Sequence, residues 1–129
     1  MRNALLASLV LLLALAPAPV EAAEVCDEQG VCIDGANWRS GEQLDDKARA
    51  KERKKNAKRK DAALTVELRS GRGSVFIDGV WIGQVPVSFI PIKPGKHDLE
   101  VRDGETLLAR GIVEIPKNAG EVKITIGDE

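Results

Sequence analysis

Short runs in which apolar and polar residues alternate fill the C-terminal half of the chain. Their apolar positions hold mainly Val, Ile and Leu, and the runs lie at 64–68, 75–77, 99–101, 113–115 and 122–126. Because successive side chains of a strand point to opposite faces, each run predicts a strand with one buried face. No run of helical periodicity separates them, so we expect an all-β fold, a small antiparallel β-sandwich over residues 64–127.

Turn-forming residues stand between these runs. Asp78-Gly79 and Asp103-Gly104 favour tight hairpins, because these residue types tolerate positive φ. Pro94-Gly95 predicts a further turn. Pro86 and Pro91 cannot donate a hydrogen bond to a sheet ladder, so they predict edge strands or irregular segments.

The stretch GSVFIDGVWIGQVPVSFIPIKPGKHDLEVR, residues 73–102, resembles the PEGA domain family. The family pattern is a hydrophobic-Asp-Gly, then a Gly and a Pro, a Pro-Gly turn, and a His that leads into an alternating strand. The matching residues are Ile77-Asp78-Gly79, Gly83, Pro86, Pro94-Gly95 and His97. With the later strands, the resemblance covers residues 64–126, about half of the chain. The related regulatory β-sandwich appended to some peptidases is the alternative.

The resemblance implies a PEGA/prealbumin-like sandwich, a non-catalytic accessory module known in exported and cell-surface bacterial and archaeal proteins. The composition agrees, because the chain has one histidine, two cysteines and no tyrosine, and it contains neither a nucleophile elbow nor a phosphate-binding glycine loop. We therefore expect no enzyme, no catalytic residue, no cofactor and no metal site. His97 is expected to be a strand-start residue with local hydrogen bonds.

The N-terminus has the order of regions typical of a secretory signal peptide over residues 1–22. A basic head, Met1-Arg2-Asn3, precedes an apolar core from Leu5 to Leu15 and a small-residue exit that ends at Ala22. A membrane anchor is the alternative, but this core is shorter than the roughly 20 residues that cross a bilayer. We expect signal cleavage, no transmembrane span afterwards, and a mature protein in the periplasm, secreted or at the cell surface.

Two cysteines, Cys26 and Cys32, lie close together in the segment 23–40. In an exported chain such a pair favours a disulfide, and Gly30 allows the turn that brings the sulfur atoms together. A redox pair or a metal site is the alternative. A metal would need further ligands, and the one histidine, His97, lies far along the chain. We expect a short disulfide-stapled segment.

A basic segment precedes the predicted sandwich. Nine of the nineteen Lys and Arg residues lie at 47–60 with one acidic residue, Glu52. Ser40 and Gln43 have the capping-box spacing, which predicts a helix that begins there and a helical linker over 41–63. Polar residues lie on all sides of this helix, so we expect an exposed rod, or an extended charged linker if the helix frays.

The basic segment is a candidate anion-binding site. Its candidate residues are Lys47, Lys51, Arg53, Lys54, Lys55, Lys58, Arg59 and Lys60. We expect no nucleic acid, because the segment lacks aromatic residues that would stack on bases and the signal peptide points away from the cytoplasm. The other interpretations are a solvated spacer, a contact with anionic lipid, lipopolysaccharide or wall polymer, and charge pairing with an acidic surface of this chain or of a partner.

Three aromatic residues, Trp81, Phe89 and Trp38, form a candidate surface for a partner. Phe76, Phe89 and Trp81 are also the largest side chains available to the core, so Trp81 has two interpretations, as core filler or as part of an exposed contact patch. The sequence predicts an exported, non-enzymatic binding or structural accessory module whose partner is another envelope protein. The alternative is an anion-binding envelope factor tethered by residues 47–60.

Overall fold

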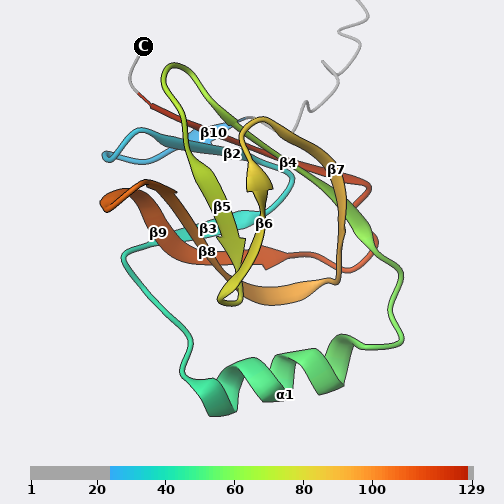
Figure 1. Cartoon of the computed structure of the whole chain (residues 1–129). Helices are drawn as coiled ribbons and strands as arrows, with labels where there is room; N and C mark the ends of the chain where they lie inside the picture. Colours follow the sequence, from blue (N-terminus) through green and yellow to red (C-terminus); the bar gives the residue numbers. More distant parts are fainter. Residues whose placement is uncertain (1–23, 128–129) are drawn as a thin grey trace, which may run out of the picture.

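The alternating runs form strands, as the sequence predicts, and the strands assemble into two five-stranded sheets. The computed structural model describes residues 24–127, so the predicted signal peptide lies outside the described residues (Figure 1). The two sheets form a sandwich with one helix, and this arrangement confirms the predicted all-β fold class.

The ten strands divide equally between sheet A and sheet B, which we name by the order of their strands. Sheet A has the order β1 (Val25–Cys26), β2 (Val31–Asp34), β10 (Glu121–Ile126), β4 (Ala62–Leu68) and β7 (Val87–Ile92). Sheet B has the order β3 (Asn37–Ser40), β9 (Thr106–Ile115), β8 (Gly95–Asp103), β5 (Ser74–Ile77) and β6 (Val80–Gln84). The consecutive strands β6 and β7 are therefore edge strands of different sheets.

One pair of strands departs from the predicted antiparallel sandwich. Strand β10 runs parallel to β4, with Val122 opposite Leu64 and Ile124 opposite Val66. Parallel neighbours need a long crossover connection. The chain between β4 and β10, which contains β5 to β9, supplies it.

The N-terminal segment belongs to both sheets, whereas the sequence predicted a separate segment over 23–40. Strand β2 pairs with β10, with Ile33 opposite Ile124, and β3 pairs with β9, with Trp38 opposite Val113. The reason is burial, because the apolar triplet Val31-Cys32-Ile33 is almost fully buried between neighbouring strands. The sandwich therefore begins well before residue 64.

The core between the sheets is aliphatic. Its most deeply buried large side chains include Leu64, Leu99, Ile115 and Ile124, each at a predicted inward position. The aliphatic residues dominate as predicted, but two of the aromatic residues considered for the core do not fill it, because Phe89 is 64% exposed and Trp81 is 58% exposed. Both lie on edge strands, where a side chain has sheet neighbours on one side only.

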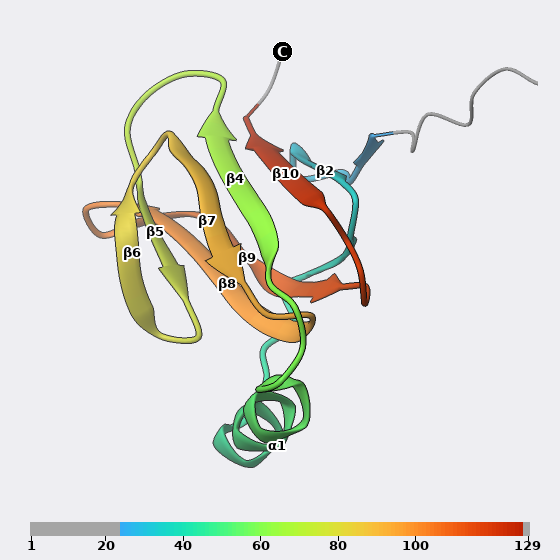
Figure 2. The same cartoon turned by 90° about the vertical axis from the view of Figure 1, so that its right-hand side faces the viewer.

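The helix α1 (Asp46–Asn56) joins β3 of sheet B to β4 of sheet A and lies beneath one end of the sandwich (Figures 1 and 2). It begins later than the predicted cap at Ser40. Asp45 is the N-cap, and its carboxylate accepts a hydrogen bond of 2.7 Å from the backbone N–H of Ala48. Ser40 cannot cap a helix here because it pairs with Gly111 in the sheet.

Candidate functional site

An ion pair attaches the helix to sheet B. Asp98 on β8 is 8% exposed, and its Oδ2 accepts hydrogen bonds from Nη2 of Arg49 at 2.6 Å and from Nε at 3.1 Å. Its Oδ1 accepts a bond of 2.8 Å from the backbone N–H of Leu44. The hydrogen bond to Asp98 raises the pKa of Arg49 above its ordinary value and outweighs the opposing effect of burial. The helix is therefore fixed on the sheet at its N-terminal turn.

A second contact fixes the middle and the end of the helix. Glu52 Oε2 accepts hydrogen bonds from the backbone N–H of Lys96 at 3.2 Å and from Asn56 Nδ2 at 3.0 Å. Asn56 is 2% exposed and lies against Gly95, where any side chain would collide with its amide. The helix thus docks through polar residues. The expectation of an exposed rod or a frayed linker followed from the missing apolar stripe, whereas these polar contacts attach the helix to the sheet.

The predicted local role of His97 extends to a contact across the sheet. Its Nδ1 lies 2.7 Å from Oδ2 of Asp78, in the turn between β5 and β6, and its Nε2 lies 2.7 Å from the backbone oxygen of Lys93. Both partners are hydrogen-bond acceptors, so both ring nitrogens donate when the imidazole is protonated. The pair therefore fits an imidazolium next to a carboxylate.

The pKa values of this pair follow from the same contacts. Burial is the largest influence on the pKa of His97 and lowers it, but the hydrogen bond and charge of Asp78, with help from the Lys93 carbonyl and Glu52, raise it above the ordinary value. Burial likewise raises the pKa of Asp78, and the bonds from His97 and from the N–H of Asp98 more than reverse this, so it lies below its ordinary value.

A small cavity of about 260 Å³ lies between the helix and the turn that enters β8. It is lined by Arg49, Asp78, Lys93 and His97, among others, and by Arg53, one of the predicted anion-binding residues. The first four groups are already bonded to one another or to neighbouring groups. This arrangement stabilises the joint between helix and sandwich.

A larger cleft of about 550 Å³ lies between the C-terminal half of α1 and the adjoining ends of β3, β8 and β9. We call it the basic cleft, because five cations line it: Arg39, Lys55, Arg59, Lys96 and Lys117. A neighbouring cleft of about 230 Å³ shares Arg59 and Lys117 and adds Lys60.

The structure therefore divides the predicted anion-binding residues. Lys55, Arg59 and Lys60 line the two clefts, together with cations from outside the basic segment. The exposed residues Lys47, Lys51, Lys54 and Lys58 line none of these described cavities. Sequence reasoning missed Arg39, Lys96 and Lys117, because only the fold brings them to the helix.

The edge strands β6 and β7 carry exposed apolar side chains. Val80, Trp81 and Phe89 are 62%, 58% and 64% exposed, and we call these three residues the β6–β7 surface. Trp81 is directly opposite Phe76 of β5 in the ladder, so the two rings belong to the same face of sheet B. Phe89 has a φ of +55°, in the left-handed region that bulky residues seldom adopt.

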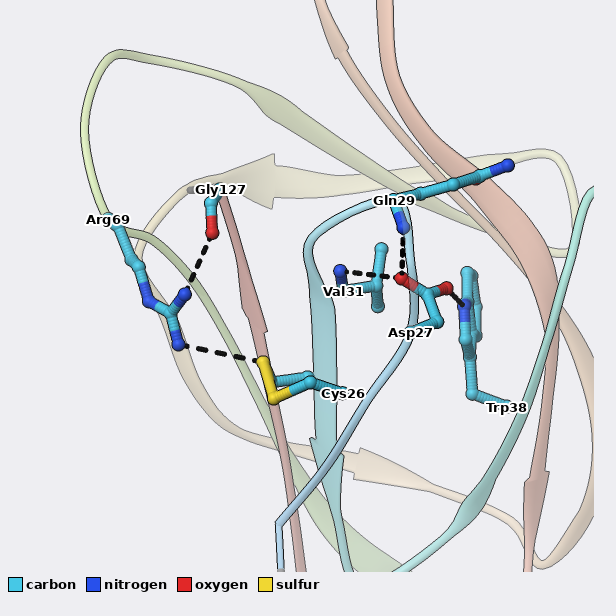
Figure 3. Close-up of a disulfide and its surroundings, with 8 residues drawn as sticks. Cys26, Asp27, Gln29, Val31, Trp38, Arg69 and Gly127 are labelled. Atoms are coloured by element: carbon cyan, nitrogen blue, oxygen red, sulfur yellow. Dashed lines mark hydrogen bonds between the residues drawn. A yellow bond between two sulfur atoms is a disulfide. The ribbon is translucent and has the colours of Figure 1, made fainter. Parts of the chain in front are cut away.

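Trp38 does not belong to this surface, contrary to its grouping with Trp81. It lies on β3, at the opposite edge of sheet B from β6. Its Nε1 donates a hydrogen bond of 2.8 Å to Asp27 Oδ2 (Figure 3). Its ring covers Gly111 so closely that a Cβ there would lie 2.7 Å away. Trp38 is a partly buried packing residue that ties the N-terminal hairpin to sheet B.

Cys26 and Cys32 form the predicted disulfide, which joins β1 to β2 (Figure 3). Arg69 lies beside it and donates hydrogen bonds of 3.5 Å to the Cys32 sulfur and 2.8 Å to the oxygen of Gly127. Glu24 is close enough to share a metal with the two sulfur atoms, but the disulfide occupies both of them. A disulfide is compatible with an oxidising compartment outside the cytoplasm.

No family model matches this chain, and neither does any curated protein or solved structure. In residues 24–127 no helix is long and apolar enough to cross a membrane, since α1 has only 11 residues and most of them are charged.

Proposed function

We propose that this chain is an exported, non-enzymatic accessory module of the cell envelope, with a PEGA-like sandwich, and that it binds another envelope protein through the β6–β7 surface. The supporting observation is the distribution of exposed large apolar residues over the strands. Three of the five such residues in the described chain lie on these two consecutive edge strands, and the other two, Val25 and Leu107, lie elsewhere. Tryptophan is one of the residue types enriched where binding energy concentrates at interfaces.

The position of the surface at two sheet edges supports the same proposal. An edge strand has unpaired backbone N–H and C=O groups, which a partner's extended segment can pair with. Among the strands of residues 24–127, β6 and β7 each have one edge without a neighbouring strand, and Val85 and Pro86 connect them. The partner we expect is therefore a protein that adds an extended segment to one of these edges and covers the Trp81 or Phe89 ring.

The strained backbone of Phe89 is a further support. A bulky residue in the left-handed region costs on the order of 1 kcal/mol or more, and such strain is concentrated at functional sites. Here the ladder between β4 and β7 changes register beside Phe89, and the Phe89 N–H bonds to the Thr65 hydroxyl at 3.2 Å instead of a ladder carbonyl. The Phe89 ring at this irregularity is largely exposed to solvent.

The non-enzymatic part of the proposal is supported by how the reactive side chains are used. His97 donates both ring N–H groups to Asp78 and Lys93 when protonated, and the two cysteines are joined to each other. These groups stabilise the fold in their present contacts.

The experiment is a capture from envelope extract with the mature chain, residues 23–129, followed by identification of the captured protein and measurement of its affinity for the purified chain. The variant is Trp81→Ala/Phe89→Ala. The matched control is Val25→Ala/Leu107→Ala, which removes two exposed apolar side chains elsewhere. We expect the first variant to weaken binding at least about tenfold, equivalent to about 1.4 kcal/mol, and the control to bind like the wild type. Equal binding by all three chains would exclude the β6–β7 surface.

A further inference from the structure

The basic cleft gathers positive charge from four separate parts of the chain. Lys55 and Arg59 come from α1 and the residues after it, Arg39 from β3, Lys96 from β8 and Lys117 from the turn after β9. Three of these five cations therefore lie outside the basic segment 47–60. The convergence is a property of the fold and is independent of the β6–β7 surface.

The cations of the cleft are not neutralised by ion pairs. Among residues 24–127, none of these five cations has a carboxylate oxygen within 4.0 Å. Two acids, Glu52 and Glu114, also line the cleft. Glu52 already accepts hydrogen bonds from the backbone N–H of Lys96 and from the Asn56 amide. The five cations and two acids leave a local excess of positive charge. A concave site of one sign concentrates field lines and attracts a ligand of opposite charge.

The cleft also offers hydrogen-bond acceptors next to the cations. Glu114 lies opposite both Lys96 and Asn37 in the sheet ladders, and all three residues line the cleft. A bare phosphate accepts hydrogen bonds but donates few, so it would leave these acceptors unused. A ligand that carries hydroxyl groups next to its anionic group uses both kinds of side chain.

The remaining lining distinguishes among anionic ligands. Among the described residues that line the cleft there is no aromatic ring, and the apolar side chains are limited to Ile115 and Pro116. A nucleobase would lack a stacking partner there, and an acyl chain would lack an apolar surface. The adjoining smaller cleft continues the groove with Lys60 and Asn118, which again combine a cation and an amide.

We propose that the basic cleft binds a phosphorylated carbohydrate, with the cations on the phosphate and Glu114 and Asn37 on sugar hydroxyls. Titration calorimetry with the mature chain tests this with three probes: glucose 6-phosphate, glucose and inorganic phosphate. The expected result is millimolar or tighter binding of glucose 6-phosphate, with binding of glucose and of inorganic phosphate at least about tenfold weaker. Equal binding of inorganic phosphate would show an adventitious ion only and would overturn the carbohydrate assignment, and no binding of glucose 6-phosphate would overturn the site.

Two triple variants with the same change in charge test the location. Arg39→Gln/Lys96→Gln/Lys117→Gln removes cations of the cleft that lie outside the basic segment. Lys47→Gln/Lys51→Gln/Lys54→Gln removes exposed cations of the helix. We expect the first variant to weaken binding of glucose 6-phosphate about tenfold or more and the second to change it less than about twofold. Equal weakening would show a general charge effect and would overturn the assignment to the cleft.

One further variant is designed to weaken binding without unfolding the chain. Lys117→Glu changes one exposed residue in a turn, and it should weaken binding of glucose 6-phosphate while amide NMR spectra remain those of a folded sandwich.

In the wild type, addition of the probe should shift amide signals around Lys117, Lys96 and Arg39 and leave those of Trp81 and Phe89 unchanged. Shifts confined to Trp81 and Phe89 would overturn the cleft as the site. The Trp81→Ala/Phe89→Ala variant should bind the probe normally, so failure of either proposal is visible separately.

Discussion

Asp78 and His97, 19 residues apart in the sequence, are joined by a hydrogen bond of 2.7 Å that connects the turn between β5 and β6 to the start of β8. Asp78 has a φ of +52°, and its other carboxylate oxygen accepts a bond of 3.0 Å from the N–H of Asp98. These are the Asp and the His of the pattern that resembles the PEGA family. In this chain, their physical role is to hold a hairpin turn against the neighbouring strand.

The first prediction is that His97 makes stability depend on pH. The pKa of His97 is raised in the folded chain, so its contribution to the free energy of unfolding is complete below its ordinary value of 6.5 and is lost as pH rises through the higher folded value. Urea unfolding between pH 5 and 9 should therefore show a falling stability for the wild type. The His97→Gln variant, which has no ionisable ring, should show a flatter profile over this window.

Asp78 affects the acidic side of the same profile. The pKa of Asp78 is lowered in the folded chain. Its contribution to the free energy of unfolding is therefore complete above the ordinary value of 3.8 and is lost as pH falls through the lower folded value. An Asp78→Asn variant should lose stability at pH 6 and should also flatten the fall above pH 6.5, because His97 loses its ionic partner. An Asp78→Asn profile parallel to that of the wild type would contradict the pairing.

The strands and the turns were largely predictable because their signals are local. Alternation at 64–68 and 122–126 places the apolar residues inward, and Asp78-Gly79 forms the turn between β5 and β6. Pro91 lies on the edge strand β7, as its missing N–H requires. The apolar triplet at 31–33 is too short to predict a strand of the sandwich. Its place beside β10 depends on pairing with residues about 90 positions further along the chain.

The second prediction concerns the contact between helix and sheet. Arg49→Ala leaves the carboxylate of Asp98 buried without its ionic partner, so we expect a loss of about 3 kcal/mol in the free energy of unfolding. Lys54→Ala, on the exposed side of the same helix, should change it by less than about 0.5 kcal/mol. The double variant Arg49→Ala/Asp98→Ala should lose less than the sum of its single variants. Urea unfolding of the wild type and of the four variants (Arg49→Ala, Asp98→Ala, the double variant and Lys54→Ala) measures these values. An Arg49→Ala variant as stable as Lys54→Ala would show that the helix is not fixed by this pair.

The third prediction compares two glycines with similar backbones. Gly79 has a φ of +81° and open space around it, so Gly79→Ala should cost only the strain of positive φ, about 1 kcal/mol. Gly95 has a φ of +106°, and a Cβ there would collide with the Asn56 amide and lie 2.6 Å from Glu52 Oε2. Gly95→Ala should therefore cost about 1–3 kcal/mol more than Gly79→Ala. Thermal unfolding of both variants makes the comparison, and equal losses would mean that the helix does not press on Gly95.

The candidate sites were less predictable than the fold, because they depend on which segments meet. A helix without an apolar stripe gives no pattern from which docking can be predicted, yet Arg49, Glu52 and Asn56 form a polar inner face. Trp38 and Trp81 look alike in the sequence, but only the strand order shows that they lie at opposite edges of sheet B. The pairing of segments that lie far apart in the sequence decides which side chains meet. The amino-acid composition gives no information on that pairing.

The fourth prediction separates stability from binding at Phe89. Glycine adopts positive φ without strain, so Phe89→Gly should leave the free energy of unfolding unchanged or raise it by up to about 1 kcal/mol, although an apolar side chain is removed. Ser88→Gly, at the neighbouring exposed position without positive φ, should lower it by about 0.5–1 kcal/mol. If the β6–β7 surface binds a partner, Phe89→Gly should also weaken capture of that partner, while Ser88→Gly should not. If Phe89→Gly is less stable than Ser88→Gly, the Phe89 ring stabilises the fold. The positive φ of Phe89 would then be explained by packing within the chain, and it would no longer support a binding role.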